Sequence, residues 1–235
     1  MKLFILYFLI LNAFIFSLNA QCTSPINIVL LGSSTSFGTG ASNTDSTYVN
    51  RYLRFLLDSV NSLCVIHNLA RSGYSTYSMQ PSSYKPPSKR VRFVPDTLRN
   101  ITKALSLRPD AIIINFPSND AGSFFSIKEQ KDNFLRVTHL IDSAGIPFWI
   151  TTTQPRNFTG DALALEKKAL LSEMRNSIIE MYPDNFIDFY DGIQSKSGNI
   201  LAAYNCGDNI HLNDAGHRLL FLRLKDKKIH RILCL

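Results

Sequence analysis

The chain has 235 residues and a formal net charge of +7, and 45% of its residues are hydrophobic against 18% that are charged. This composition excludes a disordered chain, a collagen-like chain and a coiled coil, and the length suffices for one domain with a full core. The mild basic excess favours attraction to anionic glycans or phospholipid surfaces, although a solubilising charged surface explains it equally well. Nucleic acid is not an expected partner.

The first 20 residues have the pattern of a secretory signal peptide. Lys2 precedes an almost unbroken apolar run over residues 3–16, and small and polar residues follow up to Ala20. The run is shorter than the roughly 20 residues of a membrane-spanning helix, which favours cleavage after Ala20 over an uncleaved anchor. Lipid attachment at Cys22 fits the preceding residues poorly. Cleavage would leave one domain of 215 residues, 21–235, with a charge of +6. We expect it to be secreted or periplasmic, without stable membrane insertion.

All four cysteines lie in the predicted mature chain, as Cys22, Cys64, Cys206 and Cys234. No C-x-x-C spacing occurs, which excludes a zinc ribbon. An oxidising compartment would allow disulfides. Of the three possible pairings, Cys22–Cys64 is favoured, because each of these residues precedes a predicted strand.

Short apolar runs alternate with longer amphipathic segments from residue 26 onward. In chain order the pattern predicts strand 26–31, helix 48–63, strand 64–67, helix 96–107 (with Leu98, Ile101 and Leu105 inward), strand 111–116, helix 127–144, strand 147–151, helix 163–182, strand 186–190 and helix 214–224. Five strands alternating with helices predict an α/β fold in which a parallel sheet is covered on both faces. Functional residues are expected at the carboxyl edge of this sheet.

A turn with several glycines and serines follows the first predicted strand. Its sequence, Gly32-Ser33-Ser34-Thr35-Ser36-Phe37-Gly38, fails the spacing of a P-loop, of a dinucleotide-binding turn and of the G-x-S-x-G elbow. The remaining functional interpretation is that Ser34 is a nucleophile exposed at the sheet edge. Taken alone, such a serine is more often an ordinary turn residue.

A carboxylate and an imidazole lie three residues apart near the C-terminus, as Asp208 and His211. On one helical turn this spacing lets the carboxylate accept the Nδ1–H of the ring, which leaves Nε2 free as a general base. A capping aspartate beside an incidental histidine is the alternative. His217 suggests a metal site together with His211, but the spacing and the lack of further ligands are poor for zinc, so a packing role is expected for His217.

Two further loops offer hydrogen-bond donors to an oxyanion. Gly73 follows the second predicted strand, and its N–H can face a ligand with no Cβ in the way. Asn119 follows the third predicted strand and carries a neutral amide donor. Each loop also has an ordinary turn interpretation.

The combination of Ser34, Gly73, Asn119 and the Asp208/His211 pair, each after a different predicted strand, is more specific than its parts. In these motifs the chain resembles the SGNH hydrolases, also called the GDSL esterases and lipases, over essentially the whole mature chain. The resemblance implies a flavodoxin-like three-layer α/β/α sandwich. It also implies Ser34 as nucleophile, His211 as base and Asp208 as its orienting group. The Ser34 N–H, the Gly73 N–H and the Asn119 side chain would form the oxyanion hole.

Two positions depart from the family pattern: Ser33 stands in place of the usual aspartate, and Pro117 in place of a glycine. Neither departure removes a reacting group. We expect a secreted serine esterase that acts through an acyl-enzyme without a cofactor, on short-acyl esters, chiefly acetyl esters, of carbohydrates. The aromatic and basic loop 74–95 fits a sugar or an anionic glycan ester. A packed surface loop is its alternative.

The alternative functions are a lysophospholipase or thioesterase with the same residues, an acyltransferase, and a non-catalytic carbohydrate-binding protein. The sequence leaves the oligomeric state open. It also leaves open whether Arg156 reaches the site or pairs with an acid, and whether the N-x-T sequons at Asn100 and Asn157 carry glycans.

Overall fold

The computed structural model describes residues 24–87, 92–116 and 118–233. The predicted signal peptide, Pro117, Cys22 and Cys234 lie outside the described residues. The predicted cleavage and the Cys22–Cys64 pairing therefore stay predictions.

Five parallel strands form one sheet in the order β2-β1-β3-β4-β5. The strands are β1 (Asn27–Gly32), β2 (Val65–Asn68), β3 (Ala111–Asn115), β4 (Phe148–Thr151) and β5 (Phe186–Ile187). β3 is the middle strand, and it pairs with β1 from Ile28↔Ala111 to Gly32↔Asn115. This strand order is the flavodoxin-like one. The predicted five-stranded parallel sheet is confirmed.

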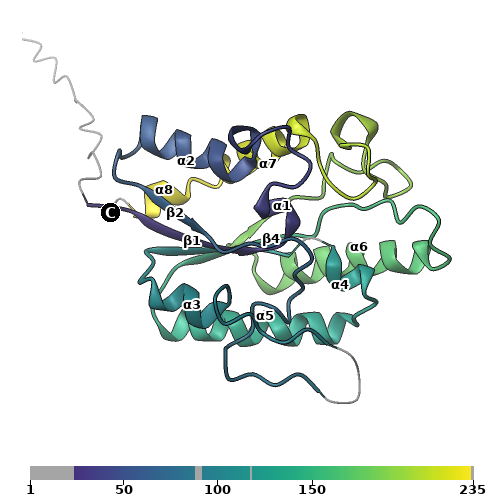
Figure 1. The fold of residues 1–235 in the computed structure, drawn as a ribbon, viewed down its shortest axis with the longest axis horizontal. Helices are drawn as coiled ribbons and strands as arrows, with labels where there is room; N and C mark the ends of the chain where they lie inside the picture. Colours follow the sequence, from purple (N-terminus) through teal and green to yellow (C-terminus); the bar gives the residue numbers. More distant parts are fainter. Residues whose placement is uncertain (1–23, 88–91, 117, 234–235) are drawn as a thin grey trace, which may run out of the picture.

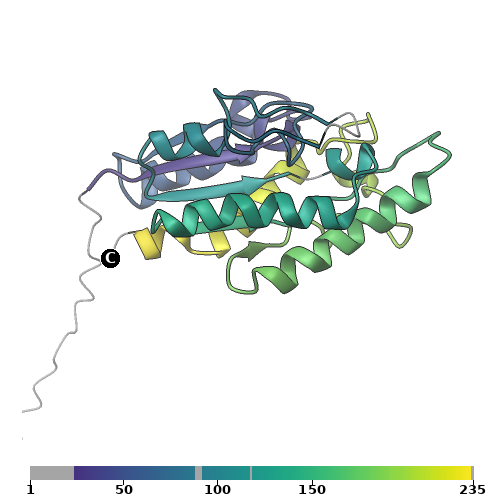
Figure 2. The ribbon, with the colours of Figure 1, turned by 90° about the horizontal axis from the view of Figure 1, so that it is seen from below.

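Helices cover both faces of the sheet (Figure 1). One face carries α2 (Tyr48–Ser59), α7 (Asp214–Asp226) and α8 (Ile229–Leu233), and the other carries α3 (Ile101–Ser106), α5 (Ile127–Ser143) and α6 (Ala164–Met181). Figure 2 shows α5 and α6 beside each other along the second face. Two short helices, α1 (Ser34–Phe37) and α4 (Asn119–Gly122), follow β1 and β3 directly.

Alternate side chains of the strands build two separate hydrophobic cores, because successive strand residues point to opposite faces. In β1, Ile28 and Leu30 pack with α2 and α7, whereas Val29 and Leu31 pack with α3, α5 and α6. All four side chains are buried. This two-sided burial explains the uninterrupted apolar run of β1 and confirms the predicted three-layer α/β/α sandwich.

The helix predicted over 96–107 begins later, at Ile101. The Asn100 side chain caps this helix by accepting a hydrogen bond from the Lys103 N–H at 3.0 Å. Leu98 precedes the cap and is 71% exposed, so the prediction that it points inward is wrong. Ile101 is fully buried, as predicted.

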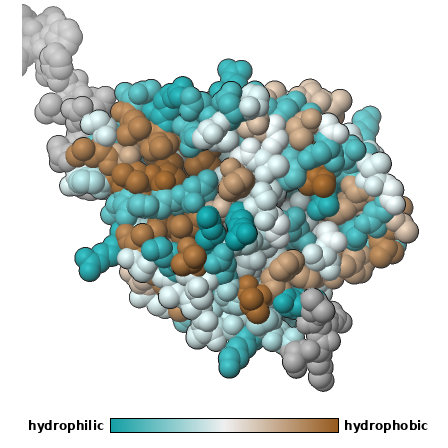
Figure 3. All heavy atoms as spheres, in the orientation of Figure 1, coloured by the Kyte–Doolittle hydropathy of each residue, from teal (hydrophilic) through white to brown (hydrophobic). Residues whose placement is uncertain are grey.

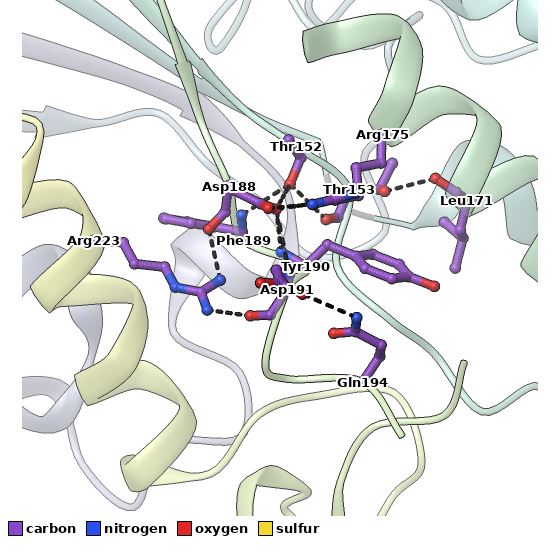
Figure 4. A network of polar contacts seen from close by, with 10 residues as sticks. All are labelled: Thr152, Thr153, Leu171, Arg175, Asp188, Phe189, Tyr190, Asp191, Gln194 and Arg223. Atoms are coloured by element: carbon purple, nitrogen blue, oxygen red, sulfur yellow. Dashed lines mark hydrogen bonds and ion pairs between the residues drawn. The ribbon is translucent and has the colours of Figure 1, made fainter. Parts of the chain in front are cut away.

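A polar network fixes the chain where β4 and β5 end (Figure 4). Asp188 forms an ion pair with Arg175 of α6 and accepts a hydrogen bond from Thr152 at 3.0 Å. Its Oδ1 also accepts the Tyr190 N–H at 2.9 Å, which turns the chain away from the sheet. Arg223 of α7 donates to the backbone oxygen of Asp188 at 2.6 Å. The strand predicted up to residue 190 therefore ends at Ile187.

Apolar side chains gather on the surface at the end of the molecule where β1 begins (Figure 3). Exposed large apolar residues of this end are Leu57, Leu63, Val65 and Ile232. The carboxyl ends of the strands lie at the opposite end (Figure 1). Within the described ranges, the helices are too short or too polar to cross a membrane.

Candidate active site

Ser34 is the first residue of α1 and follows β1 after a single residue. Helix N–H groups of the first turn have no acceptor within the helix, so the Ser34 N–H is available to a ligand. Ser36 anchors the turn from below, because its hydroxyl contacts Asn115 at 2.7 Å and Tyr48 at 2.6 Å in the core. Ser33 is fully buried, and its Oγ has no hydrogen-bond partner among the described residues.

The loop after β2 lies against this turn. The Arg71 N–H donates to the Gly32 oxygen at 3.3 Å, and the hydroxyls of Thr39 and Ser72 are 3.0 Å apart. Gly73 has a φ of +84°, which favours glycine, and a Cβ built on it would meet no atom within 4 Å. The Gly73 backbone therefore faces open space beside α1.

Asn119 is the first residue of α4 and points toward the same loop. One N–H of its amide donates to the Tyr74 oxygen at 2.8 Å. Because the amide group has two N–H donors, the second remains for a ligand. This contact brings the loops after β2 and β3 together.

Asp120 supports the same pair of loops from inside the protein. It is 3% exposed and accepts hydrogen bonds from Thr76, from the N–H at 3.0 Å and from the hydroxyl at 2.5 Å. Burial raises the pKa of Asp120 to about 6, although the Thr76 hydrogen bonds oppose this shift.

Asp208 and His211 form the predicted pair. Nδ1 of His211 is 2.5 Å from Oδ2 of Asp208, and Oδ1 of Asp208 accepts the N–H groups of Ile210 and His211, each at 2.8 Å. Partial burial alone would raise the pKa of Asp208, but these hydrogen bonds outweigh it and hold that pKa well below its usual range. The carboxylate is ionised at neutral pH and orients the imidazole.

The loop that carries His211 packs against the segment after Ser34. A Cβ built on Gly40 would lie 2.9 Å from the Cβ of His211 and would also collide with the Leu212 backbone oxygen. No hydrogen bond joins Ser34 Oγ to His211 Nε2 in the described part of the chain. Catalytic hydrogen bonds are often long in proteins without substrate and tighten in the complex.

His217 has the packing role predicted for it. It is fully buried in α7, accepts the Tyr48 N–H on Nδ1 at 3.3 Å and contacts the Thr39 oxygen through Nε2 at 3.3 Å. Burial lowers its pKa, so the ring is neutral at pH 7. Over the ranges that the structure describes, no group of three or more His, Cys, Asp or Glu residues is placed to hold a metal ion.

Two side chains of the aromatic and basic loop 74–95, Tyr77 and Arg92, pack within the protein and are not exposed for sugar binding. Tyr77 is buried, and the Arg92 side chain is only 8% exposed. Arg92 pairs with Glu129 of α5 at 2.7 Å and stacks on Phe125 with its Cζ 4.2 Å from the ring centroid. These two side chains pack the loop against α5.

Comparisons with known proteins identify the family and the fold. Residues 30–219 match the model of the GDSL-like Lipase/Acylhydrolase family, so the chain belongs to this family. Its members are acylhydrolases, and the protein is a carboxylic ester hydrolase of this type. No curated protein matches the chain.

Solved structures of the same fold are distant in sequence. The acetyl xylan esterase AlAXEase is 16% identical, with a TM-score of 0.65 over 87% of this chain and 100% of that chain. A GDSL-like lipase from Bacteroides thetaiotaomicron is 14% identical, with a TM-score of 0.62 over 85% of this chain and 86% of its own. The esterase EstA from Pseudoalteromonas sp. is 16% identical, with a TM-score of 0.57 over 86% and 95%.

Proposed function

We propose that the protein is a secreted serine esterase in which Ser34 attacks the ester carbonyl, His211 is the general base and Asp208 orients His211. The observation that carries this proposal is the 2.5 Å contact between His211 Nδ1 and Asp208, in a loop packed against the segment after Ser34. The contact leaves His211 Nε2 directed away from Asp208, as a general base requires.

The reaction proceeds in two steps through an acyl-enzyme. His211 accepts the Ser34 hydroxyl proton while Oγ bonds to the carbonyl carbon, and the alcohol leaves with that proton as the ester bond breaks. A water molecule then attacks the acyl-enzyme, His211 takes its proton, and the carboxylic acid leaves as Ser34 regains a proton. No step requires a metal or an organic cofactor.

Three donors would stabilise the oxyanion that forms in each step: the Ser34 N–H, the Gly73 N–H and the second N–H of Asn119. The support is geometric, since Asn119 is tied to Tyr74, the residue after Gly73, and the Gly73 backbone borders open space. Each such donor accounts for about 10²–10³ in turnover in related chemistry.

The substrates we propose are short-acyl esters, chiefly acetyl esters, of carbohydrates. The structurally similar AlAXEase is an acetyl xylan esterase, which favours the same class.

A serine-directed fluorophosphonate probe and a chain-length series test the proposal. We expect the probe to label the protein but not Ser34→Ala, whereas Ser143→Ala, a change at an exposed serine on α5, keeps the labelling. We expect p-nitrophenyl acetate to be hydrolysed faster than the decanoate. Labelling that survives Ser34→Ala would overturn the nucleophile.

The same assays separate the alternatives. A preference for long acyl chains would favour a lysophospholipase or thioesterase, and ester products formed with an added sugar would favour an acyltransferase. Absence of both labelling and hydrolysis would favour a carbohydrate-binding protein. Secretion is tested by the mass of the exported chain, which begins at Gln21 if cleavage follows Ala20.

A further inference from the structure

An arginine borders the candidate site and forms no ion pair with any residue that the structure describes. Arg156 follows β4 and lines a cavity of about 190 Å³ together with Thr159, Asp208 and Ile210. Its guanidinium Cζ lies 4.8 Å from the ring centroid of the buried Phe158, which holds the group in place. This cavity is therefore a recess lined by one guanidinium and by the carboxylates of Asp161 and Asp208.

The guanidinium of Arg156 has no polar partner among the described residues. Its Nε is buried without a hydrogen-bond partner, and within the described ranges Arg156 forms no ion pair. Burial lowers the pKa of Arg156, which reflects the cost of placing a charged group there. The charges of Asp161 and Asp208 oppose this shift, but neither carboxylate forms an ion pair with Arg156 within the described ranges, so a direct partner would still stabilise the partly desolvated cation.

The two acids whose charges act on Arg156, Asp161 and Asp208, each bind another side chain. Asp161 pairs with Lys167 at 2.5 Å, and Asp208 is bound to the His211 ring at 2.5 Å. Lys167 balances the charge of Asp161, whereas the charge of Asp208 remains beside the recess. Arg156 keeps hydrogen-bond donors without a partner among the described residues, and these donors can bind an anion from outside.

The recess lies between two parts of the catalytic machinery. Nη1 of Arg156 would lie 2.9 Å from a Cβ built on Gly122, in the short helix α4 that begins with Asn119. On its other side the cavity is lined by Asp208 and Asn209. A substrate whose ester group lies at Ser34 thus has a neighbouring substituent within reach of this recess.

We infer that Arg156 is a specificity-determining residue that binds a carboxylate on the sugar part of the substrate, so that the preferred substrates are short-acyl esters of acidic sugars. This inference rests on the proposed esterase function. A carboxylate is the expected group because the planar guanidinium fork matches its two oxygens. Phe158 and Ile210 supply the apolar part of the lining.

A matched pair of substrates tests the inference. The acetylated methyl glycosides of glucuronic acid and glucose differ in the carboxylate at carbon 6, and kcat/KM is measured for both at low and high salt. We expect the wild-type protein to prefer the glucuronoside by about tenfold or more, as a charge-assisted hydrogen bond allows, and salt to reduce this preference. This first measurement requires no variant.

Three substitutions then identify the residue responsible. We expect Arg156→Gln to abolish the preference and Arg156→Lys to retain part of it. Arg54→Gln removes an exposed arginine on α2 that pairs with Asp45, and the preference should survive this change. Circular dichroism verifies that each variant is folded.

The outcomes separate this inference from the function on which it rests. No preference in the wild-type protein, or a preference that survives Arg156→Gln, overturns the inference. An equal loss for both sugars and for p-nitrophenyl acetate in Arg156→Gln also overturns it, because Arg156 would then act on the triad. Failure of the esterase function itself appears as hydrolysis of p-nitrophenyl acetate that Ser34→Ala leaves intact.

Discussion

Asp120→Asn is expected to remove a pH-dependent loss of stability that the wild-type protein carries beneath the loops after β2 and β3. Burial raises the pKa of Asp120 from 3.8 to about 6. The folded state therefore favours the protonated carboxyl. Its contribution to stability is fully present below pH 3.8 and is lost as the pH rises through about 6.

The size of the effect follows from that shift. A change of about 2 pKa units corresponds to about 3 kcal/mol at pH 8. The asparagine side chain is neutral at every pH, and its oxygen can still accept the Thr76 N–H that Asp120 accepts at 3.0 Å. We therefore expect the substitution to preserve the local fold.

Urea denaturation of the wild-type and Asp120→Asn proteins between pH 4.5 and 8 measures this contribution. Over this pH range the free energy of unfolding of the wild type should fall relative to that of the variant by about 2 kcal/mol, because part of the full effect is already lost at pH 4.5. Asp132→Asn, at an exposed carboxylate on α5, serves as the control for loss of a negative charge. A difference between wild type and Asp120→Asn that does not change with pH would refute the reasoning.

Four further outcomes are expected. Asn119→Ala should lower kcat by about 10²–10³ in the p-nitrophenyl acetate assay with little change in KM, because one oxyanion donor is lost; an unchanged kcat would remove Asn119 from the site. Asp208→Asn should lower kcat by up to about 10⁴, because it favours the wrong imidazole tautomer, and an intact rate would exclude the pair. Gly40→Ala should reduce activity and lower the Tm in a thermal melt, because φ is +94° and the new Cβ collides with the His211 loop; a variant as stable and active as wild type would contradict that packing. No glycan should appear at Asn157 by intact mass after eukaryotic secretion, because its Nδ2 already donates to Asn209 at 2.8 Å.

The sequence predicts β1, β3 and β4 well because each of these strands is a short apolar run buried on both faces, as in 111–116. It does not predict the short helices that begin with Ser34 and Asn119. These helices have four residues each and no hydrophobic periodicity, and tertiary contacts stabilise them. The prediction that the candidate site residues share one edge of the sheet follows from their order along the chain, because parallel strands bring their carboxyl ends to one edge.

The environment of the site depends on contacts between distant residues, and these could not be predicted. Arg92 is packed inside the protein because Glu129 lies beside it in space, 37 residues later in the chain. No local pattern distinguishes Arg92 from Arg156, which remains without an acidic partner among the described residues. The sequence predicts that Leu98 points inward because the apolar pattern fits a helix that begins at residue 96. The cap at Asn100 instead starts the helix at Ile101 and leaves Leu98 exposed.

The proposed base, His211, and the group proposed to orient it, Asp208, occupy a single short segment of backbone. In many serine hydrolases these two residues come from separate loops, so a displacement of either loop breaks their alignment. Here Asp208 also binds the backbone N–H of His211 at 2.8 Å, which makes the pair one rigid unit. A movement of that segment would change its separation from Ser34 while the alignment of carboxylate and imidazole stays intact. In the proposed mechanism, the distance between Ser34 and His211 can therefore change the reaction rate while His211 keeps its hydrogen bond to Asp208.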